Sequence, residues 1–96
     1  MKITIVGLGY VGLPLARLFA TKYAVVGYDI NKNRIAELKF CIDRTLEVSE
    51  EQMKTVVVSK NPKGDAKGLY FTSDINKIKD SDIYIITVPT PVDKNN

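Results

Sequence analysis

Residues 3–19 read ITIVGLGYVGLPLARLF and carry the clearest structural signal of the chain. The β-branched run Ile3–Val6 is typical of a strand that is buried on both faces, and it ends at Gly7. Four apolar residues then recur with a helical period and are predicted to face the sheet: Val11, Leu15, Leu18 and Phe19. The stretch therefore predicts a strand that turns through glycines into a helix.

Strand and helix patterns alternate along the rest of the chain. Further strands are predicted at residues 23–28, 69–72 and 83–88, and helices at residues 31–39, from Ser49 onward and after Asp74. Ser49 and Gln52 fit a capping box at the start of the middle helix. Because this alternation is typical of parallel sheets with right-handed crossovers, we expect an α/β fold with strand order 3-2-1-4.

The segment between the first strand and the first helix, Gly7–Gly12, has the pattern G-x-G-x-x-G. In this context Gly7 permits the tight turn, Gly9 lets a pyrophosphate approach the backbone, and Gly12 lets the helix pack closely on the strand. The amides of the first helical turn would point at the phosphates, where the helix dipole favours negative charge. The pattern predicts a dinucleotide-binding turn, with a ligand-free glycine turn as the alternative. Its residues are Gly7, Leu8, Gly9, Tyr10, Val11 and Gly12.

Asp29 stands at the end of the second predicted strand, about 20 residues beyond the glycine turn, where dinucleotide sites place a carboxylate. There it can accept hydrogen bonds from both hydroxyls of the adenosine ribose. It would also repel the 2′-phosphate of NADP by about 4 kcal/mol at contact distance near a protein surface. The sequence therefore favours NAD. An alternative role for Asp29, compatible with the first, is to cap the following helix.

Two further elements are predicted to line the same site. Arg34, one turn beyond Asp29, can pack against the adenine or reach the ribose; it could instead serve NADP or be a solvated helix residue. Val88, Pro89 and Thr90 follow the fourth strand, and ligands bind at the carboxyl ends of strands near the point where strand order reverses. This loop is therefore expected to face the glycine turn, with a rigid exit turn as the alternative.

Composition excludes several classes of function. The 96 residues have a net charge of +3, and 45% are hydrophobic and 26% charged, as in ordinary soluble domains. The basic residues are scattered, so we expect no nucleic acid partner. No stretch is apolar enough to span a membrane and no signal peptide is recognisable, so we expect no membrane association and a cytoplasmic location.

The chain contains no histidine, and Cys41 is its only cysteine. We therefore predict no metal site and no internal disulfide. Nothing near Cys41 in the sequence would activate a thiol, so we expect it to be a small apolar packing residue. No catalytic residue is predicted in the chain.

Two stretches together resemble the UDP-glucose/GDP-mannose dehydrogenase family: GLGYVGLPLA at residues 7–16 and VPTPVD at residues 88–93. The resemblance implies the N-terminal half of a doubly wound, Rossmann-like three-layer domain that binds NAD. It also implies that residues 7–12 bind the pyrophosphate, that Asp29 and Arg34 bind the adenosine end, and that residues 86–90 line the cofactor site. The stretch DRTLEV at residues 43–48 is similar to the branch acting on UDP-N-acetylhexosamines for surface polysaccharides.

Members of this family oxidise the C6 alcohol of a nucleotide sugar to a carboxylate in two NAD-dependent steps, through a thiol adduct on a cysteine of a later domain. The resemblance therefore implies a UDP-sugar substrate, a homo-oligomer, and catalytic and substrate-binding residues outside residues 1–96, so the chain alone should be inactive. Relatives usually carry a glycine at the position of Cys41. Cys41 is thus not the catalytic thiol, and it suggests a changed turn after the second helix.

Two alternatives remain at this point. The chain could be the N-terminal part of a hydroxy-acid dehydrogenase, although the Pro-Thr-Pro loop favours the nucleotide-sugar family. It could also be a non-catalytic dinucleotide-binding module; a downstream sequence that supplies a cysteine nucleophile would instead support the dehydrogenase. We also expect the isolated chain to self-associate through residues 83–88, because the fourth strand would form an open apolar edge, and such edges pair or aggregate.

Overall fold

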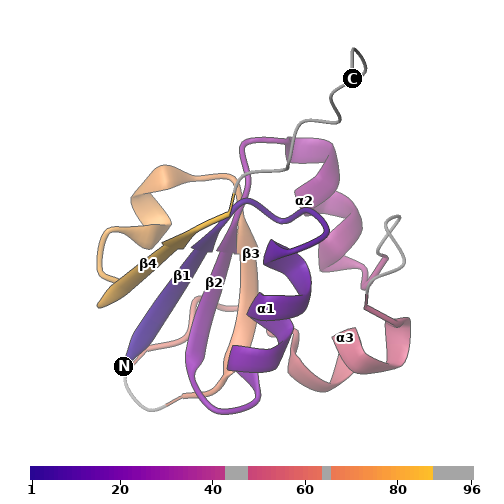
Figure 1. Ribbon diagram of the computed structural model, residues 1–96, viewed down its shortest axis with the longest axis horizontal. Helices are drawn as coiled ribbons and strands as arrows, with labels where there is room; N and C mark the ends of the chain where they lie inside the picture. The colour runs from indigo at the N-terminus through magenta and orange to yellow at the C-terminus, as the bar shows by residue number, and fades with distance from the viewer. Residues whose placement is uncertain (43–47, 64–65, 88–96) are drawn as a thin grey trace, which may run out of the picture.

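The computed structural model describes residues 1–42, 48–63 and 66–87, in which strands and helices alternate (Figure 1). In chain order they are β1 Lys2–Val6, α1 Gly12–Ala20, β2 Ala24–Tyr28, α2 Lys32–Lys39, α3 Glu50–Val56, β3 Gly68–Thr72, the 3₁₀ helix η1 Ile75–Ile78 and β4 Ile83–Ile86. The predicted order of elements is confirmed. Strand β4 ends at Ile86, and Val88, to which the pattern extended it, lies outside the described residues.

The four strands form one parallel sheet in the order β3-β2-β1-β4, as expected. The register places Val6 at the end of β1 opposite both Tyr28 of β2 and Ile86 of β4. The carboxyl ends of these three strands therefore lie side by side. This is the place where strand order reverses, and in open α/β sheets it is where ligands bind.

The main core lies between the sheet and the three α-helices, which cover one face (Figure 1). Ile3 and Ile5 of β1 point into it, and all three helices contribute buried side chains such as Ala16, Leu38 and Met53. The alternation of side chains along a strand assigns these residues to one face. The burial of each large aliphatic side chain stabilises the fold by about 1.5–3 kcal/mol.

The inner face of α1 differs from the predicted one. Its buried residues are Gly12, Leu13, Ala16 and Ala20. Val11 and Leu18 are 63% and 56% exposed, so the prediction that they face the sheet is wrong. Leu15 and Phe19 lie at the margin of the core, partly buried. The inner face combines Leu13 with three small residues, of which Gly12 lies in close contact with the glycine turn. A helical period alone does not say which of two neighbouring stripes is the inner one.

The predicted capping box of α3 is confirmed. The Ser49 hydroxyl accepts a hydrogen bond from the Gln52 backbone N–H at 3.1 Å, and the Gln52 side chain accepts one from the Ser49 N–H at 3.2 Å. Helix α2 is capped by Asn31, whose side chain accepts from the backbone N–H groups of Asn33 and Arg34. Both caps engage amides that have no partner within their own helix, which fixes where each helix begins.

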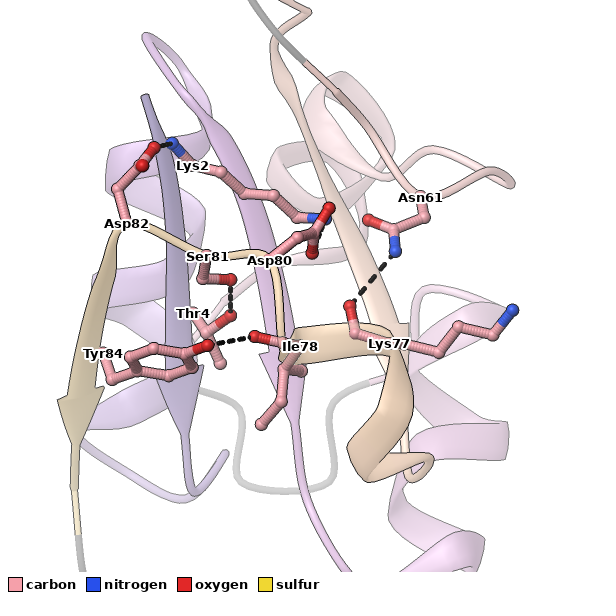
Figure 2. A network of polar contacts seen from close by, with 9 residues as sticks. All are labelled: Lys2, Thr4, Asn61, Lys77, Ile78, Asp80, Ser81, Asp82 and Tyr84. Carbon is pink, nitrogen blue, oxygen red and sulfur yellow. Dashed lines mark hydrogen bonds and ion pairs between the residues drawn. The ribbon is translucent and has the colours of Figure 1, made fainter.

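The opposite face of the sheet carries a polar network that joins β1 to the turn between η1 and β4 (Figure 2). The Nζ of Lys2 lies 2.9 Å from Asp80, and the Lys2 backbone N–H donates to the Asp82 carboxylate at 2.8 Å. The hydroxyls of Thr4 and Ser81 are hydrogen-bonded to each other. The hydrogen bond from Lys2 lowers the pKa of the Asp80 carboxyl. The network provides a partner for a lysine side chain that is only 5% exposed, and it holds the start of β4 against β1.

Cys41 follows α2 with a φ of 62°, in the left-handed region. Its N–H donates to the Leu38 carbonyl and the Ile42 N–H donates to the Glu37 carbonyl, which is a common way for a helix to end. The turn thus has the conformation typical of a glycine, and the changed turn expected from Cys41 is not seen. The side chain packs against the core, in agreement with the predicted packing role.

Candidate functional site

Gly7 makes the turn from β1 toward α1 and has a φ of +97°. Its N–H donates to the Tyr28 carbonyl at 2.8 Å, so the turn stays attached to the end of β2. A Cβ built at Gly7 would lie 2.0 Å from the Thr87 carbonyl oxygen. The turn therefore requires glycine for its dihedral angle and also for the close approach of β4.

Gly12 and Gly9 are small for different reasons. A Cβ at Gly12 would lie 1.7 Å from the Gly7 carbonyl oxygen, so this residue lets α1 begin directly against the turn. A Cβ at Gly9 would meet no heavy atom within 4 Å. The protein leaves open space at Gly9, and this is where the sequence pattern expects a pyrophosphate to approach the backbone.

Three consecutive backbone amides, those of Gly9, Tyr10 and Val11, donate to no acceptor in the described part of the chain. The N-cap residue of α1, Val11, makes no side-chain capping hydrogen bond. Tyr10 and Val11 are exposed at 67% and 63%. Unengaged amides at the start of a helix, with the positive end of the helix dipole, are suited to bind an anion.

Asp29 lies directly beyond β2 and beside the glycine turn. One of its carboxylate oxygens accepts from the Leu8 N–H at 3.0 Å, and the other accepts from the Asn31 N–H at 2.9 Å. The alternative role of Asp29 as the cap of α2 is wrong, because Asn31 occupies that position. Each carboxylate oxygen has a second lone pair, so Asp29 can still accept from ribose hydroxyls.

Arg34, in the first turn of α2, reaches back to the glycine turn. Its Nε and Nη2 both donate to the Leu8 carbonyl oxygen, at 2.8 Å and 2.6 Å. The structure therefore brings Arg34 beside the glycine turn, through a backbone contact that the sequence pattern does not indicate. Leu8 itself is 1% exposed, with its side chain beside Gly27 of β2.

Thr87 falls within residues 86–90, which the resemblance places at the cofactor site, but its contact with the glycine turn was not predicted. Its hydroxyl donates to the Gly7 carbonyl at 2.7 Å, and its backbone N–H donates to the Val6 carbonyl at 2.8 Å. The signal available in the sequence was a single hydroxyl residue after an apolar strand that ends beside the turn. Val88, Pro89 and Thr90, predicted to line the site, lie outside the described residues.

Other kinds of site find no support in the part of the chain that the structure describes. No group of three or more His, Cys, Asp and Glu side chains there could hold a metal ion. No helix among those residues has the length and apolar character needed to cross a membrane.

Comparisons with known proteins agree with this geometry. The model of the UDP-glucose/GDP-mannose dehydrogenase family, NAD binding domain, matches residues 1–96. The chain is 51% identical to the UDP-N-acetyl-D-glucosamine 6-dehydrogenase of Salmonella typhi, over 96% of this chain and 19% of that protein. It is 46% identical to Protein CapL of Staphylococcus aureus, over 99% of this chain and 20% of that protein. The chain thus spans about a fifth of the length of the curated relatives it matches.

Solved structures show the same fold. The UDP-D-ManNAc dehydrogenase of Pyrococcus horikoshii matches with a TM-score of 0.80 and 34% identity, over 95% of this chain and 21% of that one. The ternary complex of GDP-mannose dehydrogenase from Pseudomonas aeruginosa matches with a TM-score of 0.71 and 28% identity, over 99% of this chain and 21% of that one. These matches favour the nucleotide-sugar family over a hydroxy-acid dehydrogenase. The chain has a Rossmann-like sheet, a glycine turn where the strand order reverses, and a match to the family model over residues 1–96. It therefore belongs to the NAD-binding domain of the UDP-glucose/GDP-mannose dehydrogenase family.

Proposed function

We propose that this chain is the NAD-binding part of an enzyme that oxidises the C6 alcohol of a UDP-N-acetylhexosamine to a carboxylate. The observation that carries the proposal is the row of three unengaged amides at Gly9–Val11, next to the Asp29 carboxylate. Relatives named for UDP-N-acetyl-D-glucosamine and UDP-N-acetyl-D-mannosamine support this class of substrate.

The residues of the site fit NAD. The open space at Gly9 and the amides of Gly9, Tyr10 and Val11 suit the pyrophosphate, and Asp29 suits the ribose hydroxyls. NAD, when bound, accepts the hydride that leaves C6 of the sugar. We place Arg34 near the adenosine end, and we expect Val88, Pro89 and Thr90 to contact the cofactor from the end of β4.

We further propose that the catalytic cysteine and the sugar site belong to other parts of a longer protein, since the relatives are about five times as long. Cys41 lies after α2 against the core, and we assign it no chemistry. On this proposal the 96 residues bind NAD without oxidising a sugar. The complete enzyme acts in the cytoplasm as a homo-oligomer and supplies a uronic acid precursor for polysaccharide.

A titration of the purified chain with NAD and NADP tests cofactor binding. We expect NAD to bind more tightly than NADP, because a 2′-phosphate would approach the Asp29 carboxylate. Asp29→Asn should weaken NAD binding by about tenfold and narrow the difference between the two cofactors. Asp74→Asn is a matched control, since Asp74 caps η1 and makes no contact with the glycine turn. Tighter binding of NADP than of NAD to the unmodified chain would contradict the proposal.

An assay of the complete gene product tests the reaction. We expect two NADH for each UDP-N-acetylglucosamine or UDP-N-acetylmannosamine oxidised, and a lower rate of NADH formation with UDP-glucose. The isolated chain should produce none from any of these sugars. If the complete protein binds NAD but oxidises no nucleotide sugar, the chain is a non-catalytic dinucleotide-binding module instead.

A further inference from the structure

The two peptide groups that flank Leu8 are held by side chains from three separate parts of the chain. In the Gly7–Leu8 peptide, the carbonyl accepts from the Thr87 hydroxyl at 2.7 Å and the N–H donates to Asp29 at 3.0 Å. In the Leu8–Gly9 peptide, the carbonyl accepts from Arg34 at 2.8 Å and 2.6 Å. The remaining group of this second peptide, the Gly9 N–H, donates to no acceptor within the described residues.

The geometry of a peptide gives this arrangement a consequence. No peptide bond in the described residues is cis, and in a planar trans peptide the N–H points away from the side to which the carbonyl points. When Arg34 holds the Leu8 carbonyl, the Gly9 N–H on the same plane is therefore directed away from Arg34. The buried Leu8 side chain fixes the Cα between the two peptides, so neither plane can turn freely.

The charge of Arg34 adds an electronic effect. A guanidinium that donates twice to one carbonyl forms charge-assisted hydrogen bonds, which are stronger than neutral ones. Such bonds polarise the peptide and make its N–H a better donor. A lysine could place one donor on the carbonyl, but it lacks the planar fork of Arg34 that allows Nε and Nη2 to act together.

We propose that Arg34 is a positioning residue that orients and polarises the Leu8–Gly9 peptide, so that the Gly9 N–H is presented to the cofactor pyrophosphate. The inference rests on the proposed function, since it takes the anion at Gly9 to be the pyrophosphate of NAD. Arg34 then acts on the pyrophosphate through the backbone of the turn. In this role its removal weakens ligands that carry a diphosphate more than it weakens those that carry only the adenosine group.

The test compares Arg34→Ala and Arg34→Lys with the unmodified chain, and Lys32→Ala serves as control because Lys32 is an exposed cation in the same helical turn. NMR titrations measure the affinity for NAD, ADP and adenosine, and hydrogen exchange measures the protection of the Leu8 and Gly9 amides without ligand. We expect Arg34→Ala to weaken NAD and ADP by about tenfold, as for the loss of a charge-assisted hydrogen bond, and to leave adenosine within about twofold. Exchange of the Leu8 amide should accelerate, and Arg34→Lys should restore less than half of the lost affinity.

Equal losses for adenosine and ADP would overturn the inference, because Arg34 would then act only through the adenosine group and contribute nothing at the diphosphate. Full recovery in Arg34→Lys would also overturn it, since charge alone would then suffice. The same holds if Arg34→Ala leaves ADP affinity or Leu8 exchange unchanged. If the unmodified chain binds neither NAD nor ADP, the proposed function itself is contradicted. If the unmodified chain and Arg34→Ala bind both ligands with equal affinity, only the role of Arg34 is contradicted.

Discussion

Gly9 and Gly12, which lie just before and at the start of α1, offer a sharp test of the site. A methyl group added at Gly12 should lower the stability of the fold, whereas one added at Gly9 should lower the affinity for NAD. In Gly12→Ala the new Cβ would lie 1.7 Å from the Gly7 carbonyl oxygen and 2.5 Å from the Thr87 hydroxyl. The first neighbour is a backbone atom of the turn and the second is a hydroxyl that is hydrogen-bonded to it, so neither can move aside easily and α1 must shift away from the turn. Overpacking of this kind costs about 1–3 kcal/mol. The loss of the hydrogen bond from Thr87 to Gly7 adds about 1 kcal/mol.

We therefore expect Gly12→Ala to lower the free energy of unfolding by about 3 kcal/mol, a large part of the 5–15 kcal/mol typical of a domain. In Gly9→Ala the new Cβ meets nothing within 4 Å, and the φ of Gly9 is not in the left-handed region. Its stability should stay within about 0.5 kcal/mol of the unmodified chain. NAD affinity, however, should fall at least about tenfold in Gly9→Ala, because the methyl group occupies the space for the pyrophosphate.

Urea denaturation followed by circular dichroism measures the first effect, and calorimetric titration with NAD measures the second. A free energy of unfolding for Gly12→Ala within about 1 kcal/mol of that of the unmodified chain would contradict the tight contact at Gly12. The reasoning about the ligand fails if Gly9→Ala binds NAD normally. If Gly9→Ala is the less stable of the two variants, the assignment of the two glycines is reversed.

Three further predictions concern the rest of the fold. Cys41 has a φ of 62°, a backbone conformation that costs energy for any residue except glycine. Cys41→Gly should therefore be more stable than Cys41→Ala by about 1 kcal/mol in urea denaturation, and an equal or higher stability of the alanine variant would contradict this cost. Asp80→Asn should lower the stability at pH 7 by about 1 kcal/mol, since Asp80 is more than half exposed and water screens its pair with Lys2. The lowered pKa of Asp80 means that the pair contributes fully above the ordinary pKa of a carboxyl, near 4, and that this contribution is lost as the pH falls through the lowered pKa. The difference in stability between the variant and the unmodified chain should therefore shrink steadily as the pH is lowered below about 4, and a difference that stays undiminished down to the lowest pH at which the chain is folded would refute the ion pair. Finally, β4 pairs only with β1 among the described residues, and Ile86 is 70% exposed. The isolated chain should therefore self-associate through this open strand edge, as measured by light scattering, and Ile86→Lys should reduce the association. A monomeric mass at every concentration would contradict the prediction.

The sequence predicted those features of the fold that depend on local pattern. The strand–turn–helix unit at residues 3–19 and the capping box at Ser49 are set by residues close to one another in the chain, and the structure confirms both. The strand order followed from the alternation of elements and the handedness of crossovers. These inferences need no knowledge of which side chains meet across the sheet.

The inner face of α1 could not be predicted in this way. Val11 and Leu18 are as apolar as the residues that face the sheet, so a hydrophobic period fits either stripe. The inner stripe contains the small residues Gly12 and Ala16, and a Cβ at Gly12 would lie 1.7 Å from the Gly7 carbonyl oxygen, so the close contact at this end of α1 requires a small residue inside. The burial of Lys2 was also unpredictable, because its partner Asp80 is far away in the sequence and belongs to a turn.

The same distinction applies within the site itself. The glycine pattern predicts where a backbone can turn and where a ligand can approach, but it does not specify how the peptide planes of the turn are oriented. Here that orientation depends on Asp29 beyond β2, Arg34 of α2 and Thr87 beyond β4, each of which contacts a backbone atom of Gly7 or Leu8. A chain with the same glycines but without these three side chains would retain the turn and lose the hydrogen bonds that fix its amides. Preorganised donors bind an anion better than donors that must first be oriented, so the affinity for NAD should depend on these contacts as much as on the glycines.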